Sequence, residues 1–170
     1  MTKNTWENNY KKNRFNRYPF SEIITYTMRL FPSNLKRRNI KVLDLGCGGG
    51  THANFFISEG FDYYAVDQSK TSVKITVSKI KKKDLKKKVF LSNFDKLPFK
   101  SKYFDYLIDR HSLTHNSNSE LGEITKEIYR VLKNKGYFLS IIFGDKHSEK
   151  KYGVKFYNKK EVEFYSNYNK

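Results

Sequence analysis

The 170-residue sequence has a single cysteine, Cys47, and its polar and aromatic N-terminus does not resemble a signal peptide. One cysteine excludes an internal disulfide and a cysteine-rich metal site, and no cluster of histidine and acidic residues has metal-ligand spacing. The longest apolar runs, such as residues 137–143, are far shorter than the roughly 20 residues of a membrane-spanning helix. We therefore expect a cytoplasmic protein without a bound metal or a membrane partner.

Proline is also scarce, and no repeat, low-complexity linker or Pro/Gly-rich hinge divides the chain, whose length suits one domain. Strand-like apolar segments alternate with helix-like ones, which favours right-handed crossovers and a parallel sheet. Strands are predicted at Ile40–Leu45, Tyr63–Val66, Lys88–Ser92, Phe104–Asp109 and Gly136–Phe143, and helices at Thr51–Glu59, Ser69–Lys83 and Glu120–Lys133. The pattern predicts an α/β fold, a Rossmann-like doubly wound, mostly parallel sheet of about five strands with helices on both faces.

Two further helical segments are expected before the first strand. Thr5–Asn13 carries Trp6 and Tyr10 at i,i+4 spacing, and Pro19–Leu30 has a proline suited to the first turn of a helix. They could be plain packing helices that cover one edge of the sheet. They could also form a lid, because aromatic residues ahead of a ligand-binding turn can exclude water. We assign residues 1–35 to a helical lid segment and residues 36–170 to the ligand-binding domain.

Acidic residues are few, and the net charge of +17 could indicate a nucleic-acid partner. The basic residues comprise 27 lysines and 7 arginines, whereas arginine is the side chain favoured for bidentate phosphate and base recognition. The densest lysine cluster lies within residues 79–88, where a helix is expected to end and cations are favourable. A solvated helix end is therefore the favoured interpretation, and nucleic-acid binding stays possible.

The most informative stretch is residues 42–51, an apolar strand that ends in Asp44 and continues into a glycine-rich turn. Gly46, Gly48 and Gly50 allow the backbone to turn sharply and to approach a ligand closely. In an open parallel sheet, ligands bind beyond the carboxyl ends of the strands. Four predicted strands have polar residues at that end: Asp44, then Asp67-Gln68, Asn93-Phe94-Asp95 and Asp109-Arg110-His111.

The two acidic residues at the first two strand ends indicate the kind of ligand. Asp67, about 20 residues beyond the glycine turn, is suited to accept hydrogen bonds from both hydroxyls of a ribose. Either a dinucleotide or S-adenosylmethionine (SAM) contains such a ribose. The carboxylate of Asp44 would repel a pyrophosphate, whereas it would attract the ammonium and sulfonium groups of SAM. These charges favour SAM.

The sequence resembles the class I SAM-dependent methyltransferases over residues 40–143. Four segments occur in the order of that family: residues 42–50, residues 66–69, residues 97–105 and residues 129–137. The resemblance implies that the methionine end of SAM contacts Asp44 and the turn residues Gly46, Cys47, Gly48 and Gly50. It implies further that Asp67 binds the ribose, Gln68 the ribose or adenine, and Asn93 with the Phe94 amide the adenine, although an aspartate is usual at position 93. We also expect Tyr10 and Asp109 to contact the cofactor.

Methyl transfer is an in-line displacement that needs a base only when the acceptor arrives protonated. His111 and His115, just after the fourth strand, are the candidate catalytic bases. Residues 109–115 resemble an Asp-Arg variant found in some small-molecule methyltransferases. Within it, Asp109 and Arg110 could pair with each other, contact the methionine end of SAM or orient an anionic acceptor.

The absence of certain motifs limits the classes of methyl acceptor that we expect. No Asn/Asp-Pro-Pro-Tyr/Phe run follows the fourth strand, which disfavours methylation of a base amine, and no second cysteine supports a covalent route to cytosine. We expect transfer to an oxygen, nitrogen or sulfur atom of a small molecule. An RNA methyltransferase and a SAM-binding module without catalytic activity remain alternatives.

The C-terminal part departs from the resembling family, which usually adds a helix and a β-hairpin after its fifth strand. Here a polar connection follows Phe143, and a helix is expected at Asn158–Tyr165. The fifth strand would then lie near an exposed sheet edge, where the chain could oligomerise, unless the sequence is truncated.

Overall fold

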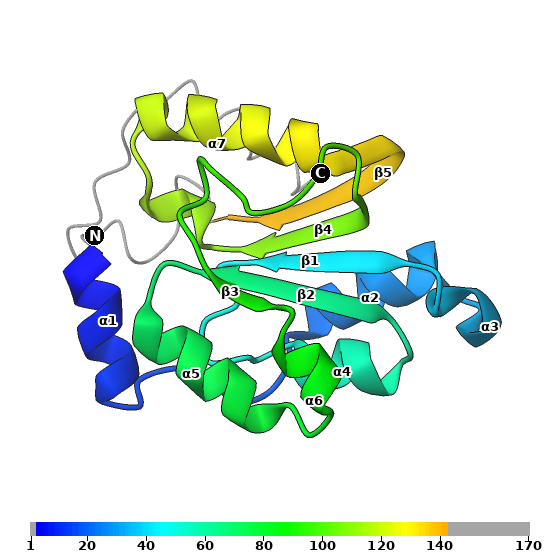
Figure 1. Cartoon of the computed structure of the whole chain (residues 1–170), viewed down its shortest axis with the longest axis horizontal. Coiled ribbons are helices and arrows are strands. Elements are labelled where there is room, and N and C mark those ends of the chain that lie inside the picture. Colours follow the sequence, from blue (N-terminus) through cyan, green and yellow to red (C-terminus); the bar gives the residue numbers. More distant parts are fainter. Residues whose placement is uncertain (1–2, 143–170) are drawn as a thin grey trace.

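The computed structural model describes residues 3–142, so the helix expected at Asn158–Tyr165 lies outside the described residues. Its centre is one sheet of five parallel strands in the order β3-β2-β1-β4-β5 (Figure 1). The strands are β1 (Lys41–Leu45), β2 (Asp62–Asp67), β3 (Val89–Leu91), β4 (Phe104–Arg110) and β5 (Leu132–Ile141). The chain reverses its direction of winding between β1 and β4, where ligands bind in doubly wound sheets. The predicted fold class is confirmed.

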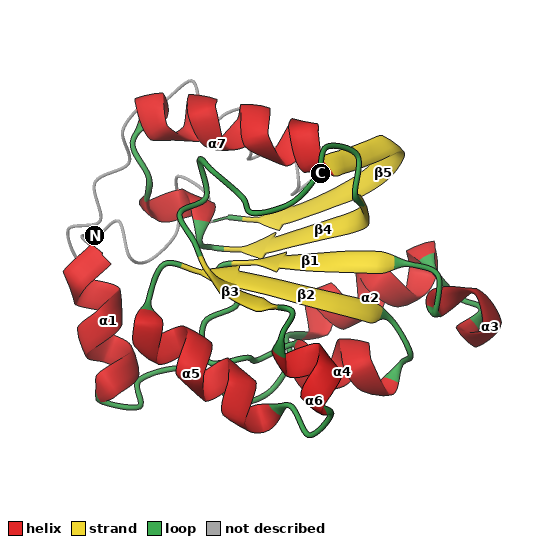
Figure 2. Ribbon diagram, viewed as in Figure 1, coloured by secondary structure: helices red, strands yellow, loops and turns green. Residues whose placement is uncertain are grey.

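Helices cover both faces of this sheet (Figure 2). They are α1 (Lys3–Lys11), α2 (Ser21–Leu30), α3 (Asn34–Arg37), α4 (Ala53–Ser58), α5 (Lys70–Lys79), α6 (Lys83–Lys86) and α7 (Asn118–Val131), with a 3-10 turn, η1, at Leu113–His115. Strands buried on both faces alternate their side chains between two cores. One core includes Val42, Tyr106 and Ile108 together with Ile23 of α2 and Phe56 of α4. The other contains Leu43, Leu45 and Leu107 together with Ile124 and Ile128 of α7.

Two of the predicted signals at helix ends, Ser69 and Gly60, are confirmed. Ser69 is the N-cap of α5, because its hydroxyl accepts a hydrogen bond from the Ser72 amide. Gly60 follows α4 with a φ of +86°, a left-handed conformation that glycine adopts without strain. A reciprocal capping box between Ser117 and Glu120 starts α7 two residues earlier than predicted.

Several predicted boundaries are wrong. The helix expected over Ser69–Lys83 ends at Lys79, because the next residue, Ile80, is extended and buried in the core under the sheet. The lysine cluster of residues 79–88 therefore covers the end of α5, the connection, α6 and the residue before β3. Helix α7 ends at Val131, and β5 begins at Leu132 rather than Gly136, with an irregular register against β4. Helix α2 begins at Ser21, so Pro19 precedes the helix instead of occupying its first turn.

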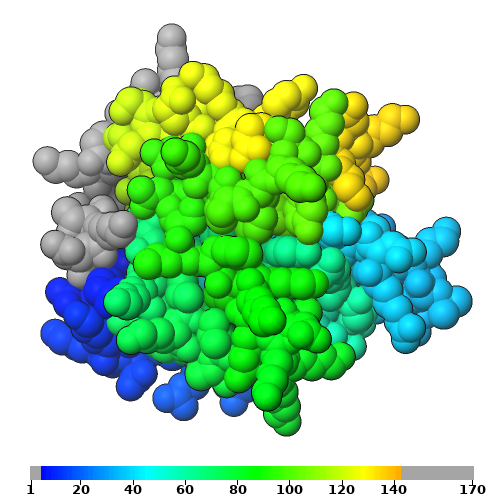
Figure 3. Space-filling view, in the orientation of Figure 1, coloured from blue at the N-terminus to red at the C-terminus, as the bar shows by residue number. Residues whose placement is uncertain are grey.

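The N-terminal helices occupy different positions. Helix α2 belongs to the core, where Ile23 is fully buried and the Thr27 and Tyr106 hydroxyls are 3.1 Å apart. Helix α1 instead packs beside α5 at the carboxyl end of the sheet, as the blue and green surfaces show (Figure 3). As predicted, Trp6 and Tyr10 lie on one side of α1, with ring centroids 6.1 Å apart. Helix α1 is therefore placed where it can cover the ligand side of the sheet.

Within the described residues, β5 is an edge strand, and Tyr137 and Phe138 on it are about half exposed. Pairing of two chains through this edge stays a prediction. None of the helices found within residues 3–142 is both long enough and apolar enough to cross a membrane.

Candidate functional site

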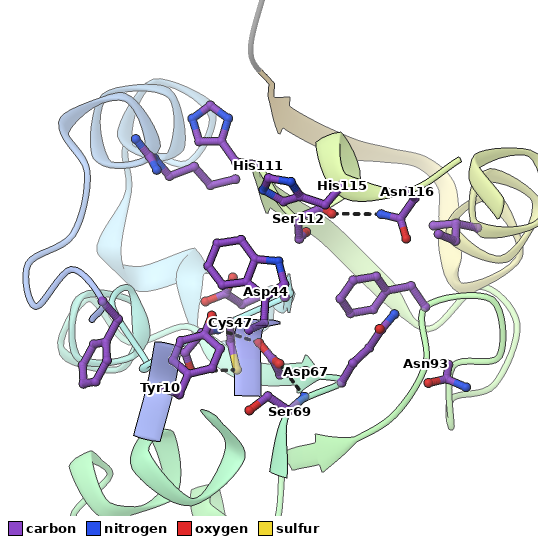
Figure 4. A pocket seen from close by; sticks show the side chains of 18 of the residues that line it. Tyr10, Asp44, Cys47, Asp67, Ser69, Asn93, His111, Ser112, His115 and Asn116 are labelled. Atoms are coloured by element: carbon purple, nitrogen blue, oxygen red, sulfur yellow. Dashed lines mark hydrogen bonds between the residues drawn. The ribbon is translucent and has the colours of Figure 1, made fainter. Parts of the chain in front are cut away.

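A cavity of about 1090 Å³ opens at the carboxyl ends of β1, β2 and β4. Its wall continues through α1, the connection from α1 to α2, and the first turns of α7. In Figure 4, Asp44, Cys47 and Asp67 occupy the centre, with His111 and His115 above them and Asn93 at the lower right. The volume is at the upper end of the roughly 300–1,000 Å³ typical of small-molecule sites, which leaves room for two ligands side by side.

The glycine turn after β1 is held rigidly by its neighbours. The amides of Gly46 and Cys47 both donate to the Val66 carbonyl of β2, at 2.9 and 3.0 Å. The hydroxyls of Ser72 and Thr76, both buried on α5, donate to the Gly48 carbonyl. The turn therefore keeps its shape without help from a ligand, as a preorganised site requires.

Gly48 shows why the turn needs glycine. Its φ is +56°, and a Cβ there would lie 2.9 Å from the Tyr10 hydroxyl of α1. The Tyr10 side chain thus lies directly over the turn, and burial raises the pKa of its hydroxyl, which stays protonated at neutral pH. This contact joins α1 to the cavity floor.

Asp44 supplies a buried carboxylate at the end of β1, where only 2% of the residue is exposed. Its Oδ2 accepts a hydrogen bond from the Tyr63 hydroxyl at 2.8 Å and lies 3.5 Å from Nδ1 of His52. Burial raises the pKa of Tyr63, so this hydroxyl remains a donor. A buried carboxylate that lines a cavity is suited to a cationic ligand.

Asp67, at the end of β2, lies on the same cavity wall. Its Oδ2 accepts from the Gly48 amide at 2.9 Å and its Oδ1 accepts from the Ser69 amide at 2.8 Å. Burial raises the pKa of this carboxyl. Each carboxylate oxygen retains a second lone pair, so a ligand with two adjacent hydroxyls can still bind there.

Most of the other predicted cofactor residues reach the cavity as well. Gln68, Asn93 and Phe94 line the wall beyond β2 and β3, while Cys47 and Gly46 line the floor. Burial raises the pKa of the Cys47 thiol well above its ordinary value, so it is a packing group rather than a nucleophile.

Two predicted residues do not line the cavity. Gly50 faces α5, where a Cβ would come within 3.0 Å of the Thr76 hydroxyl. Asp109 is fully buried behind the wall and accepts hydrogen bonds from the side chains of Ser112 and Ser140 and from the Leu113 amide. Burial raises its pKa to about 6. Asp109 therefore ties the end of β4 to β5 and to η1.

Both candidate bases line the cavity. His111 has a φ of +63°, an uncommon conformation for a non-glycine residue, and its amide donates to the Ile141 carbonyl at 2.8 Å. The ring of His115 lies 5.1 Å from the ring of Trp6, which brings η1 against α1. The two histidines thus occupy the wall formed by the segment after β4.

Helix α1 is fastened to the cavity rim by Glu7. Its carboxylate accepts hydrogen bonds from the Ser69 hydroxyl at 2.6 Å, the Thr71 hydroxyl at 2.5 Å and the Thr71 amide at 3.2 Å. These bonds, with the Ser69 bond the strongest influence, lower the pKa of Glu7 to about 2. The carboxylate is also placed at the N-terminus of α5, where negative charge is favourable.

Sequence reasoning missed several cavity residues, above all His52. It is 4% exposed, lines the cavity beside Asp44, and its Nε2 atom has no hydrogen-bond partner among the described residues. Its position directly after the glycine turn could have indicated a role. Arg14 and Phe15, from the α1–α2 connection, also line the cavity, and no motif marks them. Ser112 lines it as well and lies within the motif-like residues 109–115, but no role was predicted for it.

Residues 42–136, more than half of the chain, match the family model of a methyltransferase domain. The chain belongs to the class I SAM-dependent methyltransferases. It is 33% identical over 102 residues to a sarcosine/dimethylglycine N-methyltransferase of Aphanothece halophytica, covering 58% of this chain and 36% of that protein. It is 28% identical over 115 residues to a ubiquinone biosynthesis O-methyltransferase of Pelagibacter ubique, covering 68% of this chain and 47% of that protein.

Solved structures give the same family. A SAM-dependent methyltransferase of Methanosarcina mazei superimposes with a TM-score of 0.59 at 25% identity, over 66% of this chain and 56% of that one. The chain spans less than half the length of each of these two curated relatives. The expected family and its cofactor, SAM, are thereby confirmed.

The cavity itself fits SAM on physical grounds. A Cβ at Gly46 would come within 2.4 Å of Ser112, so the floor of this methyltransferase is shaped by a position that takes only glycine. The buried carboxylates of Asp44 and Asp67 suit an ammonium group and a ribose. The wall that contains Phe94 and Asn93 offers an aromatic ring and an amide group, which suit an adenine ring.

Proposed function

We propose that the protein transfers a methyl group from SAM to an oxygen, nitrogen or sulfur atom of a small-molecule acceptor. One observation carries this proposal: two buried carboxylates, Asp44 and Asp67, end neighbouring strands and face one cavity large enough for a cofactor and an acceptor. The family membership of residues 42–136 supports the reaction type. SAM supplies an activated methyl group whose leaving sulfur needs no protonation.

The chemical groups of the residues that line the cavity suggest which part of SAM each residue binds. In this proposal Asp44 binds the ammonium of SAM, and Asp67 accepts hydrogen bonds from the ribose hydroxyls. Gln68, Asn93 and Phe94 form the wall for the adenine. Gly50 and Asp109 support the site from behind, since the former packs on α5 and the latter holds η1.

The acceptor occupies the part of the cavity near η1. His111 and His115 are the groups there that can accept a proton, so we assign them the role of base for an acceptor that arrives protonated. The similarity to a sarcosine/dimethylglycine N-methyltransferase and a ubiquinone biosynthesis O-methyltransferase supports a small acceptor.

Helix α1 acts as a lid in this proposal. Tyr10 covers the glycine turn, Trp6 contacts His115, and Glu7 fastens the helix to α5. A closed helix excludes water from the cavity, and an open one admits the ligands. The residues of α1 therefore belong to the functional unit, in contrast to α2, which is part of the core.

Isothermal titration of the full chain with SAM and with S-adenosylhomocysteine tests the proposal. We expect saturable binding of both ligands with one site per chain. No binding of either ligand at millimolar concentration would contradict the proposed function. A screen of small acceptors with methyl-labelled SAM then separates an active enzyme from a SAM-binding module without activity.

A further inference from the structure

Arg110, the last residue of β4, has no role in the site described so far. Side chains alternate along a strand, so Asp109 and Arg110 point to opposite faces of the sheet. Asp109 faces Ser112 and Ser140, whereas Arg110 emerges on the face that carries Tyr106 and Ile108, and its guanidinium lies over the Phe20 ring, 3.1 Å from the centroid. The two neighbours therefore do not pair with each other.

The guanidinium of Arg110 lines the cavity but lacks a close anionic partner. Its Nε is buried without a hydrogen-bond partner, and no ion pair of Arg110 occurs within residues 3–142. Burial lowers the pKa of Arg110, and the carboxylates of Glu22 and Asp109 counteract this only through space. Stacking on Phe20 offsets part of the cost of burying this cation, but it leaves the in-plane N–H donors free to bind an oxyanion.

The strand register places Arg110 close to the proposed cofactor site. Asp44 of β1 pairs with Ile108 of β4, and Arg110 is two residues further along the same face. It therefore lies roughly 7 Å beyond Asp44 along the strand and roughly 5 Å across the sheet. Phe20 connects the two positions, because its ring also lies 5.9 Å from the ring of His52, the neighbour of Asp44. An anion held by Arg110 would thus lie within the length of a small molecule from the cofactor.

A second guanidinium is better placed for the cofactor's own carboxylate. Arg14 lines the cavity from the segment that lies over the glycine turn, where the Phe15 ring would be 2.3 Å from a Cβ at Gly49. The Thr51 hydroxyl, which donates to the Asn16 carbonyl at 2.9 Å, fixes this segment against the turn. Arg110 instead belongs to the wall at the end of β4, next to the proposed base His111.

We propose that Arg110, stacked on Phe20, forms an oxyanion-binding subsite, and that the oxyanion is a carboxylate or phosphate group of the methyl acceptor. The planar guanidinium is the side chain best suited to bind such groups through two parallel hydrogen bonds. The subsite would orient the acceptor so that its reacting atom faces the methyl donor. This inference rests on the proposed function and specifies its acceptor as an anion.

The test compares acids with neutral analogues of the same shape on the full chain saturated with S-adenosylhomocysteine. The pairs are sarcosine and its amide, 4-hydroxybenzoate and 4-hydroxybenzamide, and phenyl phosphate and phenol. Binding is measured by saturation-transfer NMR and titration for the wild type, Arg110→Gln and Arg110→Lys, with Arg14→Gln as the matched control. Affinities for S-adenosylhomocysteine and for 5′-methylthioadenosine, which lacks the amino-acid end, are measured for each variant.

We expect the wild type to prefer the acid in at least one pair and Arg110→Gln to weaken that acid by about 10- to 100-fold. Arg110→Lys should show an intermediate loss, and Arg14→Gln should keep the preference. Retained binding of 5′-methylthioadenosine shows that each variant is folded.

Two results would overturn the inference. In the first, the wild type binds none of the acids more tightly than the neutral analogue. This result would count against the subsite without any measurement on a variant. In the second, Arg110→Gln weakens S-adenosylhomocysteine but not 5′-methylthioadenosine, which assigns Arg110 to the carboxylate of the cofactor. Failure of the wild type to bind S-adenosylhomocysteine would instead contradict the proposed function itself.

Discussion

Glu7 fastens α1 over the cavity, and its replacement by glutamine should loosen this helix. The carboxylate accepts three hydrogen bonds from Ser69 and Thr71. Hydrogen bonds to a charged group contribute about 1.5–3 kcal/mol each when buried. The Glu7 side chain is 25% exposed, so solvent screening reduces this contribution, and glutamine retains one acceptor oxygen. We expect Glu7→Gln to destabilise the docked position of α1 by about 1–2 kcal/mol, a 5- to 30-fold shift toward the undocked state.

Trp6 makes this change measurable, because it is the only tryptophan of the chain and it lies on α1 against Tyr10 and His115. Undocking should shift its emission to the red, increase its quenching by iodide and reduce the hydrogen-exchange protection of the α1 amides. Lys11→Gln is the control, because Lys11 is mostly exposed and its 3.8 Å pair with Glu7 should contribute less than about 0.5 kcal/mol.

The docking of α1 should weaken at low pH. The pKa of Glu7 is lowered to about 2, so its contribution to docking is complete above about pH 4.5 and is lost as the pH falls toward 2. Glu7→Gln should remove this part of the dependence. Unchanged α1 exchange rates in Glu7→Gln at pH 7 would refute the fastening role of Glu7.

Further predictions concern the cofactor, the core and the charge. Asp67→Ala should weaken S-adenosylhomocysteine by a few kcal/mol in titration calorimetry, because the ribose hydroxyls lose their acceptor; an unchanged affinity would remove Asp67 from the site. The raised pKa of Asp109, about 6, means that the folded protein holds this proton more tightly than the unfolded chain, so stability should fall by up to about 3 kcal/mol as the pH rises from about 4 to 6. Urea unfolding of Asp109→Asn should lack that slope. Gly46→Ala places a Cβ 2.4 Å from Ser112 at a φ of +71° and should cost about 2–4 kcal/mol, whereas Gly122→Ala, open on all sides within α7, should stabilise by about 1 kcal/mol. If RNA were the acceptor, its affinity should fall steeply between roughly 50 and 200 mM salt; with a small-molecule acceptor, a weak or flat dependence is expected.

The parts of the fold that depend on local signals could be predicted from the sequence. The glycine turn and the polar residues at the strand ends can be recognised from a few neighbouring positions in the sequence. They predict Asp44, Gly46 and Asp67 at one cavity, and the structure brings these residues together. Boundaries that depend on tertiary contacts could not be predicted. The lysine-rich stretch after α5 has good helix propensity, but burial of Ile80 in the core ends the helix at Lys79.

The difference between local signals and tertiary contacts also explains which site residues could be predicted from the sequence. His52 directly follows the glycine turn in the sequence, but its 3.5 Å approach to Asp44 depends on the folded chain, and neither the spacing nor a motif indicates that distance. The sequence alone did not show that Asp109 is a structural residue and not a cofactor contact. Its hydrogen-bond donor on the next strand, Ser140, is 31 residues away in the chain. Such pairings require the order and register of the strands.

The alternation of side chains along β4 explains why Asp109 and Arg110, although adjacent, have different surroundings. A strand buried on both faces must point one residue of the pair toward α7 and the other toward α2. The α7 face offers Ser112, Ser140 and backbone amides, so a carboxylate there becomes a structural acceptor, and its burial raises its pKa in spite of these donors. The α2 face offers Phe20 and the open cavity, so the guanidinium there is stacked but available to a ligand. Exchanging the two residues, Asp109→Arg with Arg110→Asp, should therefore destroy both functions, because each group would face partners of the wrong chemistry.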